Sequence, residues 1–71
     1  MIDFQLKSEF IELDNLLKAQ GLVSSGAEAK QVIQSGAIKV NGQSETRIRR
    51  KLRGGDSVEF GGQQISIIAK K

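Results

Sequence analysis

The side chains of this sequence that are best suited to chemistry are cations gathered in one short run. Five of the eight residues from Thr46 to Arg53 are cationic and none is acidic. Guanidinium groups make charge-assisted, bidentate contacts with phosphate. The run is therefore a candidate binding site for a polyanion. The cationic positions are Arg47, Arg49, Arg50, Lys51 and Arg53.

An extended backbone would place alternate residues of this run on one face. Ile48 and Leu52 would then point to the opposite face and touch the core. Arg50 breaks the alternation, which predicts a bend or bulge at that residue. A solvated surface is the other interpretation of a charge run, and the absence of acids within the run disfavours it. The four cations expected to share the outer face are Arg47, Arg49, Lys51 and Arg53.

The charge of the whole chain is distributed unevenly. Residues 1–35 hold three cations and five acids, whereas residues 36–71 hold eight cations and three acids, so the halves carry −2 and +5. A basic half on a small domain is typical of a protein that binds a polyanion such as nucleic acid. Solubility alone could also account for so modest an excess.

Several function classes lack the residues that they need. The chain has no Cys and no His, which removes disulfides, thiolate nucleophiles, imidazole bases and the usual zinc ligands. No two carboxylates are held together by the sequence pattern, and Asp14 and Asp56 fit turn or surface positions better. We therefore expect no enzyme activity, no metal site and no cofactor. No apolar run approaches the roughly twenty residues of a membrane span, so we expect a soluble, cytoplasmic protein. We also expect it to be a monomer.

A short helix followed by a hairpin is the strongest local pattern. Ser25 and Glu28 form a capping box, in which the serine oxygen accepts a backbone N–H and the glutamate reaches back to the N–H of the cap. Gly36 can adopt the left-handed conformation that ends a helix. Asn41-Gly42 then predicts a two-residue hairpin turn. The exposed N-terminus of this helix would present backbone N–H groups and a positive dipole to a phosphate.

The remaining segments complete an α+β fold in one domain that spans residues 1–71. Alternating apolar residues predict a strand from Ile2 to Leu6, and helical spacing predicts a helix over 9–20 that is capped by Ser8 and buries Phe10. Two further strands are expected at 57–60 and 64–68. We expect two packed helices against a small antiparallel sheet.

The aromatic content bears on how a nucleic acid would be recognised. There is no Trp and no Tyr, and the three phenylalanines occupy positions that fit a core. The aromatic platforms on which single-strand binders stack bases are therefore not expected. If the polyanion is a nucleic acid, this composition favours recognition by shape and backbone over the stacking of bases.

A spaced series of residues resembles one known family. The series begins with Leu13-Asp14, continues through Gly21-Leu22 and Ser25, and ends with Val40-Asn41-Gly42 and Gly55-Asp56. It is similar to the small RNA-binding domain named after the fourth protein of the small ribosomal subunit, also called the αL motif. The resemblance covers roughly residues 10–60. It implies a bacterial, non-catalytic module that binds structured RNA such as ribosomal RNA or tRNA-like stem-loops, with the ribosome or its precursor as a further partner.

The family resemblance also implies where RNA would bind, namely the second helix and the loop that follows it. Many members carry an arginine directly after the helix serine, where this chain has Gly26, and Lys30 is the nearest cation that could replace it. Two other functions stay open, a protein adapter whose basic face meets an acidic partner, and a duplex-DNA binder that Glu28 disfavours. The residues to which a binding role is assigned are Ser25, Lys30, Lys39, Arg47, Arg49, Arg50, Lys51 and Arg53.

Overall fold

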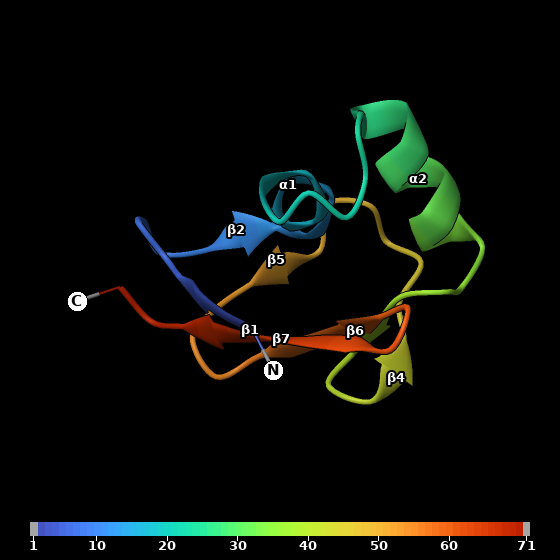
Figure 1. Ribbon diagram of the computed structural model, residues 1–71. Coiled ribbons are helices and arrows are strands. Elements are labelled where there is room, and N and C mark those ends of the chain that lie inside the picture. The colour runs from blue at the N-terminus through green and yellow to red at the C-terminus, as the bar shows by residue number, and fades with distance from the viewer. Residues whose placement is uncertain (1, 71) are drawn as a thin grey trace.

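A computed structural model describes residues 2–70, so Met1 and Lys71 lie outside the described residues. Two helices lie on one side of a larger sheet, and a two-stranded ribbon lies between them and that sheet (Figure 1). The described chain thus has three levels, and the ribbon connects the helices to the sheet. In chain order the elements are β1 (Ile2–Gln5), β2 (Ile11–Glu12), α1 (Leu13–Ala19), α2 (Gly26–Gln34), β3 (Lys39–Val40), β4 (Gln43–Ser44), β5 (Lys51–Leu52), β6 (Ser57–Phe60) and β7 (Gln63–Ile68).

The larger sheet has the strand order β1-β7-β6-β3-β4, and the ribbon pairs β2 with β5. The pairs β6–β7, β3–β6 and β3–β4 are antiparallel. The first strand joins this antiparallel sheet in parallel, with Ile2 opposite Ile65. The α+β fold that was expected from the sequence is confirmed, with one parallel pair at the edge of its sheet.

The core lies where the helices face the larger sheet. The helices contribute three fully buried side chains, Leu16 and Leu17 of α1 and Ile33 of α2. In the sheet, Val58 and Ile65 are each only 1% exposed. Side chains alternate across a strand, so the neighbours of the buried sheet residues point to the opposite face. The larger sheet therefore has one face against the helices and one face in solvent.

The helix and hairpin predicted after residue 24 are confirmed. Ser25 Oγ accepts the backbone N–H of Glu28 at 3.2 Å, which starts α2, and Gly36 ends it with a φ of 83°. Asn41 and Gly42 have φ of 53° and 85°, as a tight hairpin turn requires. One detail of the cap was wrong, because the Glu28 carboxylate accepts the backbone N–H of Ser24 at 2.6 Å and not that of Ser25.

The helix expected over 9–20 is shorter than predicted and begins at Leu13. Ile11 lies opposite Leu52 in the β2–β5 ribbon, so strand pairing with a distant segment replaces the first helical turn. Ser8 caps no helix, because its hydroxyl donates to the carbonyl of Phe10 at 2.9 Å. Phe10 itself is half-buried and lies outside the core cluster, so its assignment to the core was wrong.

Candidate functional site

The basic run forms a loop that is fixed to the start of α1. The backbone N–H of Leu13 donates to the carbonyl of Arg50 at 2.9 Å, and that of Asp14 donates to the carbonyl of Ile48 at 3.1 Å. These two N–H groups belong to the first turn of α1 and have no partner within the helix. The loop therefore supplies the cap that no side chain gives to α1, and in return its own path is held.

A buried carboxylate organises the cations at the start of this loop. Glu45 is only 7% exposed. Its two oxygens accept the Nε and Nη2 hydrogens of Arg47, both at 3.0 Å, and one of them also accepts from Nη1 of Arg50 at 2.7 Å. The backbone N–H of Arg47 donates to the same carboxylate at 2.9 Å. One acid thus binds two arginines, and three charged groups leave a net charge of +1.

These contacts stabilise the ionised form of the carboxylate. The hydrogen bonds and charge of Arg47 act first, with help from Arg50, and together they lower the pKa of Glu45 from 4.5 to about 2 against the opposing effect of burial. Sequence reasoning missed Glu45, because the search for compensating acids stopped at the ends of the run. The signal that could have identified Glu45 is its spacing, since it precedes Arg47 by two residues and Arg50 by five on a loop that is expected to bend.

The five cations of the run fall into two groups in the structure. Arg47 and Arg50 are the ion-pair partners of Glu45, with side chains 71% and 28% exposed. Arg49, Lys51 and Arg53 are exposed, and within residues 2–70 no carboxylate lies within ion-pair distance of them. Glu12 lies opposite Lys51 across the ribbon without forming an ion pair with it. The extended backbone predicted for the run is confirmed only at Lys51 and Leu52, because residues 47–50 form a turn in which the N–H of Arg50 donates to the carbonyl of Arg47 at 3.4 Å. Ile48 and Leu52 nevertheless face the core, as expected. Within the run, the exposed cations without an ion pair therefore lie at residues 49–53.

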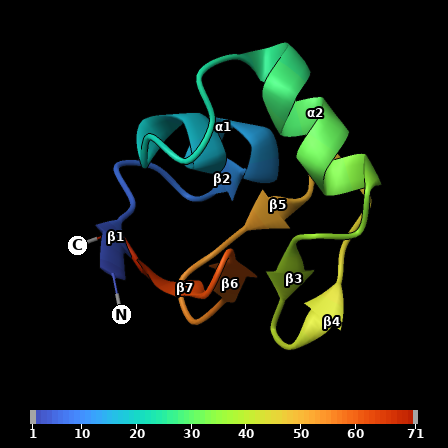
Figure 2. The same cartoon turned by 45° about the vertical axis from the view of Figure 1, so that its right-hand side comes forward.

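The predicted site at the start of α2 lies at the end of this helix that is remote from the larger sheet. Figures 1 and 2 both show α2 beginning at the end most distant from the larger sheet, whereas the basic run lies below it. Ser25 uses its oxygen as the helix cap, and its hydroxyl hydrogen remains available for donation. Lys18 Nζ lies 3.9 Å from the place where a side chain of Gly26 would begin. Lys18, which sequence reasoning did not select, is thus a cation beside this helix end, and Lys30 is exposed on the helix itself.

Lys39 is not brought together with the other predicted site residues. Val40, the next residue of β3, is buried toward the helices, so Lys39 points to the solvent face of the larger sheet. Glu59 lies directly opposite Lys39 on β6, where unlike charges attract across strands. Lys39 therefore belongs to a mixed polar face that carries acids as well as bases.

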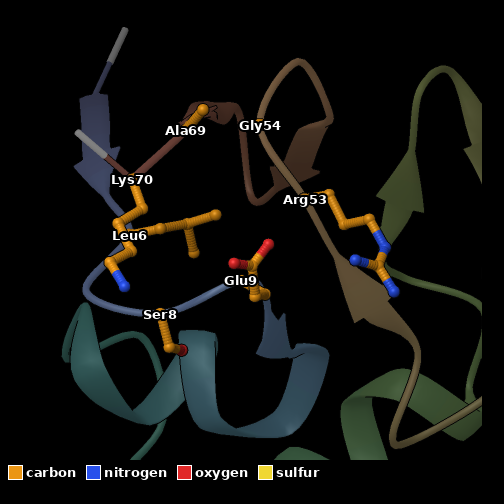
Figure 3. Close-up of a pocket in the computed structure, with 7 residues that line it drawn as sticks. All are labelled: Leu6, Ser8, Glu9, Arg53, Gly54, Ala69 and Lys70. Carbon is orange, nitrogen blue, oxygen red and sulfur yellow. The ribbon is translucent and has the colours of Figure 1, made fainter.

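A groove of about 470 Å³ lies beside the basic run, between the end of β7 and the segment that precedes β2. Figure 3 shows the carboxylate of Glu9 directed toward this groove, while the guanidinium of Arg53 points away from it. An anion in the groove would meet the acid and not the arginine. Lys70 lines the groove as well, so the charged lining includes one acid and one lysine, while the guanidinium of Arg53 lies outside it.

The described part of the chain offers neither a metal centre nor a membrane span. Within residues 2–70, no three side chains of His, Cys, Asp or Glu cluster so that they could bind a metal ion. Neither helix in this range has the length and apolar character needed to cross a bilayer.

Comparison with known proteins supports the sequence-based resemblance. Residues 4–68 match the family model of the S4 domain. The chain is 43% identical over 70 residues to the Escherichia coli (strain K12) protein named "Putative RNA-binding protein YbcJ". This match covers 97% of this chain and 100% of that protein. An "Uncharacterized protein YbcJ" from Shigella flexneri matches with the same identity and coverage. The solution structure of Escherichia coli YbcJ, described as revealing an αL motif involved in RNA binding, superposes with a TM-score of 0.73 over 97% of this chain and 89% of that one.

Proposed function

We propose that this chain, which belongs to the S4 domain family, binds structured RNA without catalysing a reaction. The observation that carries the proposal is the group of three exposed cations, Arg49, Lys51 and Arg53, that have no carboxylate partner within the described residues. Relatives that cover the whole length of the chain are named or described as RNA-binding. A fixed set of unpaired cations is what a phosphate backbone requires.

The loop geometry favours a folded RNA over a flexible strand. Backbone hydrogen bonds to Leu13 and Asp14 and the ion pairs of Glu45 hold the loop before any ligand arrives. A preorganised surface loses little conformational entropy on binding, but it contacts several phosphates at once only if those phosphates are themselves fixed in space. Stems fix their phosphates in this way, whereas single strands do not.

The proposed contact surface has a primary and a secondary part. The primary part is the run at residues 49–53, together with Arg47, whose guanidinium is largely exposed although it is paired with Glu45. The secondary part, proposed from the family resemblance, is the start of α2 with Ser25 and Lys30. Arg50 acts through Glu45 in positioning the loop, and Lys39 lies outside the surface. The proposed clients are stem-loops of ribosomal RNA, of its precursor or of tRNA-like form.

A comparison of three ligands tests this function. Fluorescence anisotropy would measure the affinity of the full chain for a labelled RNA stem-loop, an unstructured RNA strand and a DNA duplex of equal length at physiological salt. We expect the stem-loop to bind at least about tenfold more tightly than the other two, since non-specific charge attraction alone distinguishes them weakly. Equal affinities would contradict the proposal. No binding of any of the three would favour an acidic protein as the partner of the basic surface.

A further inference from the structure

The outer face of the β2–β5 ribbon carries an aromatic ring beneath two cations. Ile11 and Leu52 are paired across the ribbon, so Phe10 lies next to Arg53 on the adjoining strand. Lys51 Nζ is 4.9 Å from the centroid of the Phe10 ring, and Arg53 Cζ is 5.8 Å from it. Both distances lie within the roughly 6 Å over which a ring attracts a cation. The three side chains therefore form one cluster, which we call the ribbon cluster.

The ribbon cluster is not part of the hydrophobic core. Phe4 and Phe60 pack against the core, whereas Phe10 is half-buried and lies outside that set. The inward side of the ribbon is already occupied by Leu52, which is fully buried. Since alternate residues of a strand point to opposite faces, Phe10 and its two cations point outward. The ring is thus half-buried beside two exposed cations, Lys51 and Arg53.

The charges of the ribbon cluster are incompletely balanced within the molecule. Two cations approach one ring, while Glu12 is the acid opposite Lys51 on the same face of the ribbon. Neither cation has a carboxylate within ion-pair distance in the described range. Their mutual repulsion weakens the attraction that the ring offers to each of them. A ligand that combines an anion with a flat aromatic group would satisfy both parts of the cluster, because the anion binds the cations while the flat group covers the ring. An unpaired nucleotide is such a ligand.

We propose that Phe10 is a stacking platform for one unpaired base of the bound RNA, with Lys51 and Arg53 contacting the phosphates on either side of it. This inference rests on the proposed RNA-binding function and adds to it a preference for stems that carry an unpaired nucleotide. It replaces the expectation from composition that the chain lacks an aromatic platform, because that expectation assigned all three phenylalanines to the core. Arg53 can also lie against the base, since guanidinium planes stack on nucleobases.

A tryptophan reporter tests the contact directly. The sequence contains no Trp, so Phe10→Trp introduces a single indole, and Phe60→Trp gives a matched reporter on the sheet. Two RNAs would be used, a stem closed by a loop of unpaired nucleotides and a blunt duplex with the same stem sequence. We expect the loop RNA to quench the emission of Phe10→Trp, and the duplex to quench it much less. The emission of Phe60→Trp should change with neither RNA.

Affinity measurements with two further variants complete the test. Phe10→Leu keeps an apolar side chain without a ring, and it should weaken binding of the loop RNA roughly tenfold while changing binding of the duplex less than about twofold. Phe10→Tyr keeps the ring and should restore wild-type affinity. Circular dichroism would verify that each variant is folded, and Phe60→Leu controls for the loss of a ring elsewhere.

The outcomes separate this inference from the function on which it rests. Quenching at residue 10 together with selective loss of loop binding in Phe10→Leu would support the platform. Tight stem-loop binding by the wild type, without quenching at residue 10 and with unchanged affinity in Phe10→Leu, would overturn the platform and leave RNA binding intact. Failure of the wild-type protein to bind either RNA would overturn both.

Discussion

Replacing Glu45 by glutamine should lower the stability of the fold in a way that depends on pH. The side chain keeps its size, so the change removes the charge that binds Arg47 and Arg50 without creating a cavity. Arg47 can return to water because its side chain is already 71% exposed. Arg50 is only 28% exposed and would be left half-buried without its acid, so most of the cost comes from this second arginine.

The magnitude follows from the shifted pKa of the carboxylate. A fall in the pKa of Glu45 from 4.5 to about 2 sets a ceiling of about 3.4 kcal/mol at 1.36 kcal/mol for each pKa unit. Water and salt screen the pair with the exposed Arg47, so the realised value must be smaller. We expect Glu45→Gln to lower the free energy of unfolding by about 1.5 to 2 kcal/mol at neutral pH.

The sign of the pH dependence is fixed by the direction of the shift. The folded protein binds a proton at Glu45 less readily than the unfolded chain does, because the folded pKa is the lower one. The contribution of Glu45 is therefore complete above the unfolded value and is lost as pH falls from about 5 toward 2. Wild type should lose stability over this range, whereas Glu45→Gln should lose less, so that the two converge at low pH.

Urea unfolding followed by far-UV circular dichroism at several pH values would measure this difference. The exposed acid Glu59 provides a matched control, since Glu59→Gln removes one charge without touching the loop. If Glu45→Gln were as stable as wild type at neutral pH, or declined as steeply on acidification, the carboxylate would not hold the loop as described.

Other substitutions test separate parts of the structure. Gly54→Ala should lower the free energy of unfolding by about 1 to 3 kcal/mol, because its Cβ would come within 2.7 Å of the Cα of Ala69; an unchanged melting temperature would contradict the packing. Asn41→Ala should lower the free energy of unfolding by about 1 to 2 kcal/mol in the same assay, because it removes two side-chain hydrogen bonds. Asn41→Gly should lower it less than Asn41→Ala does, because glycine adopts the positive φ of this position without strain. A Cβ at residue 26 would have only Lys18 Nζ near it, so Gly26→Arg should be tolerated. The new arginine should strengthen stem-loop binding by on the order of 1 kcal/mol. Weaker or unchanged binding by a folded variant would mean that the start of α2 is not part of the RNA-binding surface.

The parts of the fold that were predicted correctly from the sequence depend on neighbouring residues. The cap at Ser25, the helix end at Gly36 and the turn at Asn41-Gly42 each require only the conformational preferences of a few adjacent positions. The order of elements then indicates an α+β fold, because two helices and several short strands must share one core.

The parts that were missed depend on pairing between distant segments. Ile11 and Glu12 fit a helical pattern, yet they pair with Leu52 and Lys51 some forty residues later. That pairing also moves Phe10 from the predicted core to a half-buried position outside it. The parallel pairing of β1 with β7 joins the two ends of the described chain and has no local signal either.

The candidate site was predicted in part for the same reason. The cations expected on the outer face are exposed, but only Lys51 lies in an extended strand, because residues 47–50 form a turn. The run could not reveal that Glu45 binds Arg47 and Arg50, because that contact requires the loop to bend. Nor could it show that Lys39 lies on another face, which follows from the position of β3 in the sheet.

The salt dependence of stem-loop binding by two charge-matched variants tests most directly where the RNA-binding surface lies. The first changes Arg49, Lys51 and Arg53 to glutamine and removes the available cations of the run. The second makes the same change at three exposed lysines elsewhere, Lys7, Lys39 and Lys70. Both variants lose three positive charges, so a difference between them reports where the RNA lies and not how much charge the protein carries.

Each phosphate contact lowers log affinity by roughly 0.7 to 0.9 for each unit of log salt, because a bound cation releases condensed counterions. We expect the slope of the first variant to fall by about 2 to 2.7 and that of the second by less than about 0.5. Only the first variant should bind the stem-loop much more weakly than wild type does. A first variant that keeps the wild-type slope and affinity, or two variants that lose the same amount, would contradict the claim that residues 49–53 form the RNA-binding surface.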